Sequence, residues 1–182
     1  MTLQGNVIVT DASDLTITPL PAAPLHALEI WSNPQAVAAR FVTAMGYSLP
    51  SLGKSNTAAN GLVLIRYEPA VWLVEGDPAV LPQILAGDGA LTDIGGGILR
   101  VRISGTHWRA LLMEGGIFDV ESPTFIPGSS AATIIDHVAV RLHVVSGDTC
   151  DVYVPASFSQ GLIHFWQQAI KTIDPFGVTL NP

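Results

Sequence analysis

Three stretches of the chain repeat the same order of elements, two short apolar strands followed by one helix. Each helix opens at a capping residue or proline and keeps its apolar residues on one face. The expected strands and helices are 62–67, 71–75 and 77–87; 90–94, 98–103 and 104–115; and 133–145, 150–154 and 157–170. Short turns between paired strands predict antiparallel hairpins with the helices on one face of the sheet. The predicted fold class is therefore α+β, built from repeated β-β-α units around a mainly antiparallel sheet.

The residues before the repeat are expected to add a strand and a helix. Leu28 to Trp31 alternates like a strand, and Ser32-Asn33-Pro34 offers an N-cap followed by proline at the first helical position. Gly46 can end this helix in a left-handed cap. Residues 47–60 are rich in Ser, Gly, Asn and Ala, so we expect a mobile surface loop there.

The two ends of the chain are expected to lie outside the domain. Residues 1–27 carry Pro19, Pro21 and Pro24, which remove strand hydrogen-bond donors, so we interpret them as an extended arm. Residues 174–182 are expected to form an irregular tail. The predicted organisation is one α+β domain over residues 28–173 between the arm and the tail.

The chain is poor in charge. Only 13% of its residues are charged and 48% are hydrophobic, whereas soluble globular proteins have about 25% charged residues. Such a chain either exposes apolar and uncharged polar surface or covers part of its surface with a partner protein. We favour a partner. The four tryptophans are mostly placed for the core and so do not mark an interface, and the better candidates for the interface are the N-terminal arm and residues 122–130.

Charge and cysteine content exclude several classes of function. Fifteen acidic and eight basic residues give a net charge of −7, and Lys54 and Lys171 are the only lysines, so the charge that nucleic-acid binding requires is missing. The apolar runs end long before the ~18 residues that span a bilayer, and the first residues do not resemble a secretion signal. Cys150 alone can form neither an internal disulfide nor a cysteine-based zinc site. We therefore expect a cytoplasmic protein without nucleic-acid or membrane partners.

The histidines do not form a catalytic or metal-binding group in the sequence. His137 and His143 lie on one face of a predicted strand, with six residues of strand placing them ~20 Å apart, too far to bind one metal. We interpret them as a polar strip facing solvent or an interface. His26, His107 and His164 have no acidic residue or second histidine at ligand spacing, so structural roles are expected.

Other reactive residues are also interpreted as structural. The glycines 95–97 are followed by a strand and not by a helix, so a hairpin turn is expected there and not a phosphate-binding loop. Cys150 lies near Asp148 and Asp151, whose negative charges raise a thiol pKa, and is expected to be inert. Arg100 and Arg102 face away from the core, either toward solvent or toward an acidic partner surface. We expect no catalytic residue and no metal site on the chain.

Several motifs, taken in their order and spacing, resemble a known family between about Leu28 and Gln168. Residues 91–94, 98–105 and 111–112 resemble the strand, strand, Ser-Gly and helix segment of the folate-binding glycine-cleavage T-protein superfamily. Within that superfamily, four further segments look like the gamma subunit of heterotetrameric sarcosine oxidase. These segments are 115–120, 125–128, 137–142 and 151–158.

The resemblance implies a T-protein-like fold and a non-catalytic, structural gamma subunit of a flavoenzyme that oxidatively demethylates sarcosine. It implies alpha and beta partner subunits, and a delta subunit where the complex has one. It places FAD, FMN, NAD and tetrahydrofolate on those partners, so no cofactor is expected on this chain. Glycines 95–97 depart from the Ser/His/Arg-type stretch of the relatives. No function is therefore carried over to that turn, and the N-methyl substrate stays open.

Two alternatives remain beside the gamma subunit. One is a stand-alone folate- or pterin-binding protein, related to aminomethyl transfer, in which Asp93 would hydrogen-bond the pterin. The size of the chain argues against it, because T-proteins build their folate cavity with additional domains. The other is an unrelated adaptor domain.

Overall fold

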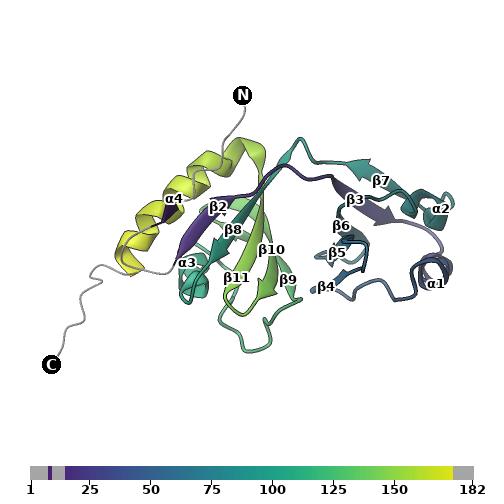
Figure 1. Ribbon diagram of the computed structural model, residues 1–182, viewed down its shortest axis with the longest axis horizontal. Coiled ribbons are helices and arrows are strands. Elements are labelled where there is room, and N and C mark those ends of the chain that lie inside the picture. The colour runs from purple at the N-terminus through teal and green to yellow at the C-terminus, as the bar shows by residue number, and fades with distance from the viewer. Residues whose placement is uncertain (1–7, 10–14, 174–182) are drawn as a thin grey trace. The chain divides into compact units, whose positions relative to one another are not determined.

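The computed structural model describes residues 8–9 and 15–173 of the chain (Figure 1). It is an α+β structure with two antiparallel sheets and helices packed against them, which confirms the predicted fold class. Sheet A has the strand order β1 (Ile8–Val9), β2 (Thr16–Pro19), β8 (Ile98–Ser104), β11 (Thr149–Pro155), β10 (Val138–Ser146) and β9 (Ser130–Ile135). Sheet B has the order β4 (Lys54–Thr57), β5 (Val63–Arg66), β6 (Val71–Glu75), β3 (Leu25–Ile30) and β7 (Gly89–Asp93). The helices are α1 (Pro34–Met45), α2 (Leu81–Leu85), α3 (Trp108–Met113), η1 (Ala156–Phe158) and α4 (Ser159–Ile173).

The chain divides into two compact units, where the sequence predicted a single domain over residues 28–173. One unit takes Gly97–Pro127 and the described residues of Met1–Pro21 and Ala132–Pro182. The second takes Ala22–Gly96 and Gly128–Ala131. Apolar periodicity identifies a strand but not the sheet that it joins, so the sequence did not separate the two units.

Residues 15–27 differ from the extended arm that the prolines predicted. Strand β2 pairs with β8, and Leu15 and Ile17 are each 1% exposed. Pro19 is the last residue of β2, and Pro21 and Pro24 lie between β2 and β3, so the prolines stand at or beyond the strand ends, where few hydrogen-bond donors are lost. The irregular tail predicted for residues 174–182 lies outside the described residues.

Glycines 95–97 do not form the predicted hairpin. Strand β7 pairs with β3 in sheet B, with Leu91 opposite Leu28, and β8 pairs with β2 and β11 in sheet A. The glycines therefore connect the two sheets. The predicted strand 133–145 is likewise two strands, because Asp136 and His137 turn the chain with φ angles of 44° and 66°. These left-handed conformations match the turns that favour tight hairpins.

The unit of sheet B is built around helix α1. As predicted, Pro34 occupies the first turn and Gly46 ends the helix with φ 77°, its amide donating to the Val42 carbonyl. The core combines this helix with the apolar faces of β3, β5, β6 and α2. Its most buried members are Leu28, Val37, Phe41, Leu62, Leu64, Val74, Leu81 and Leu85. The predicted loop 47–60 contains the edge strand β4.

Trp31 lies on the surface, although the sequence placed the tryptophans mostly in the core. It follows the last residue of β3 and is 64% exposed, whereas Trp108 and Trp166 in the other unit are 1% and 0% exposed. Trp31 stands at the junction of β3 and α1, beyond the paired part of the strand.

Asp88 fixes the junction between β3 and α1. Its carboxylate accepts hydrogen bonds from Ser32 Oγ and Asn33 Nδ2, each at 2.8 Å, and from Arg40 Nη2 at 2.6 Å. Its carbonyl accepts the backbone amides of Trp31 and Ser32. The three side-chain hydrogen bonds to the carboxylate, that from Arg40 first, lower the pKa of Asp88 from 3.8 to about 2.

The Asp88 carboxylate makes the stability of the protein depend on acid. A carboxyl group whose pKa is lower in the folded than in the unfolded chain adds stability above its unfolded pKa and loses it as pH falls toward the folded pKa. The contribution of Asp88 should therefore disappear between about pH 4 and pH 2. In urea unfolding at several pH values, Asp88→Asn should show a smaller loss of stability over this window than the wild type. Parallel pH profiles for the two proteins would contradict this role.

Gly89 is required where β7 meets β3. A Cβ atom at this position would lie 2.1 Å from the Glu29 carbonyl oxygen, which is backbone and cannot move aside. Gly89→Ala should therefore lower the free energy of unfolding by roughly 2–4 kcal/mol, measured by urea denaturation. Gly96→Ala is the control, because a Cβ there meets no atom within 4 Å. Equal stabilities of the two variants would show that the β3–β7 contact is not as close as described.

Candidate functional site

A group of polar side chains shares one face of sheet A across three neighbouring strands, β8, β11 and β10. Backbone register places Tyr153 opposite both Arg100 and Arg141, and Asp151 opposite both Arg102 and His143. Because side chains alternate along a strand, this face is opposite to the one that carries the buried residues Val101 and Val152. We call the group the polar strand cluster. Its members are Arg100, Arg102, Arg141, His143, Asp151 and Tyr153.

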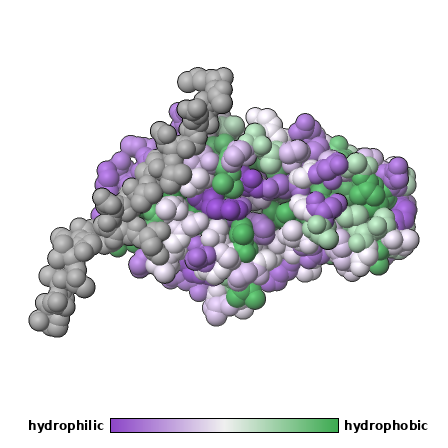
Figure 2. Space-filling view, viewed as in Figure 1, coloured by the Kyte–Doolittle hydropathy of each residue, from purple (hydrophilic) through white to green (hydrophobic). Residues whose placement is uncertain are grey.

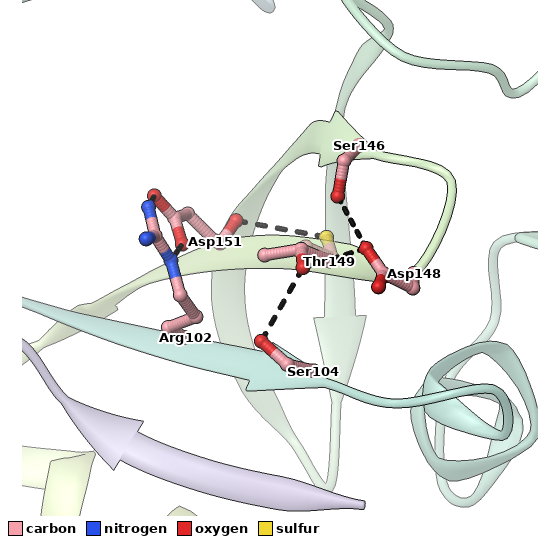
Figure 3. Close-up of polar contacts among 7 residues, drawn as sticks. Arg102, Ser104, Ser146, Asp148, Thr149 and Asp151 are labelled. Atoms are coloured by element: carbon pink, nitrogen blue, oxygen red, sulfur yellow. Dashed lines mark hydrogen bonds and ion pairs between the residues drawn. The ribbon is translucent and has the colours of Figure 1, made fainter.

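Arg102 and Asp151 form the ion pair at the centre of this cluster (Figure 3). Arg102 Nε donates to Asp151 Oδ1 at 2.7 Å and Nη2 donates to Oδ2 at 2.8 Å, so both carboxylate oxygens are bound by one guanidinium. The Asp151 residue is only 3% exposed. The hydrogen bonds to Asp151 raise the pKa of Arg102 further above its usual value. From the sequence, we considered an acidic surface of a partner protein as one possible contact of Arg102. In the structure, Arg102 binds Asp151 of its own chain.

Burial favours the uncharged forms of His143 and Tyr153. Burial is the main cause that lowers the pKa of His143, while the Asp151 carboxylate opposes it. Burial also raises the pKa of Tyr153 well above its usual range, since this residue is 1% exposed. The polar strip predicted for His137 and His143 is corrected accordingly. His137 lies exposed in the β9–β10 turn, whereas His143 is buried beside Asp151.

The turn between β10 and β11 uses its polar groups internally (Figure 3). Asp148 Oδ1 accepts Ser146 Oγ at 2.5 Å and Thr149 Oγ1 at 3.1 Å. The bond from Ser146 is the main cause that lowers the pKa of Asp148. Thr149 Oγ1 also lies 3.4 Å from Ser104 Oγ on the neighbouring strand β8. These contacts close the hairpin and tie it to β8.

Cys150 lies on the apolar face of β11 and is fully buried. Burial is the first cause that raises the pKa of its thiol, and the Asp151 charge is the second. From the sequence, we expected the neighbouring carboxylates to make the thiol inert. In the structure, burial raises the thiol pKa more than the carboxylates do. The thiol stays protonated and out of reach of solvent, so it is unsuited to nucleophilic or redox chemistry.

Asp93, the residue considered for pterin binding, lies exposed at the end of β7. Its Oδ1 accepts the Gly95 amide at 2.9 Å, which makes the carboxylate part of a turn. An open cavity of about 610 Å³ lies elsewhere in the same unit, between the end of α1 and β4. Asn56 and Asn60 line it, and both amide groups already bind the backbone, at Ser48 and Leu62.

The other histidines remain apart from the polar strand cluster. His26 lies on β3, His107 directly precedes α3, and His164 is exposed on α4. Across residues 8–9 and 15–173, no three His, Cys, Asp or Glu side chains are placed to hold a metal ion. Among the same residues, no helix has the length and apolar character to cross a membrane.

Comparison with known proteins defines the chain as a T-protein-like α+β structure. A chain of the heterotetrameric sarcosine oxidase from Corynebacterium sp. U-96 matches with a TM-score of 0.77 and 17% identity, over 91% of this chain and 88% of that one. The glycine cleavage system aminomethyltransferase T from Bartonella henselae matches with a TM-score of 0.59 and 17% identity, over 81% of this chain. The matched region is only 44% of the aminomethyltransferase. No protein-family model and no curated protein matches the sequence.

We expect Arg102 and Asp151 to stabilise sheet A jointly, so that the effects of replacing them are coupled. Removing one partner of a buried pair costs about 3–5 kcal/mol, and we expect about 2 kcal/mol for Arg102→Met because Arg102 is 38% exposed. Replacing both residues, in Arg102→Met/Asp151→Leu, should restore part of the loss, since no buried charge is then left alone. Urea unfolding of the wild type, both single variants and the double variant measures this coupling. Strictly additive losses would mean that the two side chains act independently.

Proposed function

We propose that this chain is a non-catalytic, structural subunit of the gamma type in a heterotetrameric sarcosine oxidase-type flavoenzyme. The observation that carries the proposal is the match to a chain of such an enzyme over 91% of this chain and 88% of the other. The nearly equal shares support the proposal, because the match extends over most of both chains. The aminomethyltransferase is matched over only 44% of its length, so it supports the fold but corresponds less well as a whole protein.

The polar strand cluster is consistent with a structural role. Arg102 binds both oxygens of the Asp151 carboxylate, and burial disfavours the charged forms of His143 and Tyr153. Groups fixed in this way stabilise a sheet and do not exchange protons easily near neutral pH. The low charge of the chain supports a partner as well, because surface poor in charge is favourable where another subunit covers it.

In this proposal the chemistry belongs to the larger subunits of the complex. Alpha and beta subunits, and a delta subunit where present, would hold FAD, FMN, NAD and tetrahydrofolate and would demethylate sarcosine or a related N-methyl amine in the cytoplasm. This chain would bind none of these cofactors. Its contribution would be to hold the larger subunits in their assembled arrangement.

Purification of the tagged chain from its native host tests the proposal. We expect larger chains to copurify in fixed stoichiometry and to carry the visible absorbance of flavin. A control purification with the same tag on an unrelated protein should recover none of them. Recovery of this chain only as a free protein of 19.2 kDa would contradict the proposal.

A stand-alone folate-binding protein is distinguished by calorimetric titration of the isolated chain with tetrahydrofolate. The proposed subunit should give no binding heat at micromolar protein concentration. Tight binding that Asp93→Ala abolishes would favour the alternative. Val42→Ala is a suitable control, because Val42 is an exposed residue of α1 in the same unit as Asp93.

A further inference from the structure

Three large apolar side chains are exposed at the outer strand of sheet A. Ile117 is 75% exposed, Ile134 43% and Met113 38%. Met113 is the last residue of α3, Ile117 lies in the segment that follows it, and Ile134 lies on β9. We call these three residues the isoleucine patch. Figure 2 shows hydrophobic residues at the lower edge of the view, where Figure 1 places the segment between α3 and β9.

Backbone contacts place the three residues beside one another. The Ile117 amide donates to the Ile134 carbonyl at 3.3 Å, and Gly116 forms a bridge with Ile135. The Gly116 amide also donates to the Met113 carbonyl at 3.3 Å. The segment after α3 therefore lies along β9 with Ile117 opposite Ile134, and Met113 is joined to the same segment by the Gly116 bond.

The backbone of the isoleucine patch is tightly held. Gly115 has φ 68°, and a Cβ atom there would lie 2.9 Å from Phe165 Cζ. A Cβ atom at Gly116 would lie 2.3 Å from the Leu112 carbonyl oxygen. Arg109 on α3 donates to the Val120 and Phe125 carbonyls and so anchors the following loop. A surface fixed in this way loses little conformational entropy when it binds a partner.

Four acidic residues lie in the segments that carry the patch or continue from it. Glu114, Asp119, Glu121 and Asp136 are all exposed, and the Asp136 amide binds the Gly115 carbonyl at 3.1 Å. Between residues 113 and 137 the sequence has no lysine or arginine, and a nearby cation, Arg109 of α3, is bound to backbone carbonyls of the same loop. An apolar centre beside mainly acidic residues is complementary to an apolar surface whose rim is basic.

We propose that the isoleucine patch docks a larger subunit of the flavoenzyme complex, through a partner surface of apolar side chains surrounded by Lys and Arg. This inference rests on the proposed function and adds the surface by which the chain assembles. A second copy of this chain is a poor occupant. In a symmetric dimer the same patch faces itself, so the acidic rims would meet and repel.

The test uses this chain and the larger flavin-bearing chains of the same organism, mixed as purified proteins, with the dissociation constant measured by analytical ultracentrifugation. Ile117→Lys should weaken the complex at least roughly tenfold, because it puts a charge into the apolar centre. Val145→Lys is the matched control. Val145 is 40% exposed and lies at the far end of β10 from the β9–β10 turn, so its variant should change the constant less than about twofold. Thermal unfolding should show all variants folded.

The acidic rim is tested separately by Glu114→Lys. This variant should weaken binding at low ionic strength, and the difference from the wild type should shrink as salt screens the charges. The same loss of affinity at every salt concentration would contradict a charged rim. The affinity of Ile117→Lys therefore tests the isoleucine patch, and the salt dependence of Glu114→Lys tests its rim separately.

Each outcome separates the docking surface from the proposed function. If the wild type forms the complex and Ile117→Lys forms it equally well, the docking surface is wrong and the proposed function stands. If the wild type does not bind the larger chains at all, the proposed function fails and the docking surface with it. If the isolated chain is a dimer that Ile117→Lys dissociates, the patch binds a second copy and the partner is misassigned.

Discussion

The pairing of β8 with β11 is the constraint on which the unit of sheet A depends. The register runs without a shift from Ile98 opposite Pro155 to Ser104 opposite Thr149. This register decides which residues share a face. It puts Val101 and Val152 together on the apolar side and brings Arg102 to Asp151 on the polar side. A slip by one residue would move both sets to the wrong face.

Local sequence predicted most elements but not how they combine. A short apolar run identified β6 with its observed bounds, and Pro34 and Gly46 delimited α1, because strand and cap signals depend only on neighbouring residues. The sheet that each strand joins depends on distant partners. Strand β8 comes directly after β7 in the sequence, yet β7 pairs with β3. Glycines 95–97 therefore connect two sheets and do not form the predicted hairpin.

The polar site was predictable only in part for the same reason. Alternation along β8 placed Arg102 away from the core, but its partner Asp151 lies 49 residues away in the sequence. Once β8 and β11 are paired, the contact follows from the shared face. The sequence of β10 did not predict that His143 is buried, because the same pattern of polar residues occurs on sheet faces exposed to solvent and on sheet faces covered by other residues. Asp88 likewise gained its role from three side chains that the fold brings to it.

A structural subunit that leaves the chemistry to larger chains is the central claim of this account. Native mass spectrometry of the purified complex tests it most directly, since mild dissociation releases subunits with their bound molecules. This chain should be released at its polypeptide mass of 19.2 kDa, with all flavin and folate retained on the remaining subunits. A flavin or folate that stays bound to the released chain would contradict the claim.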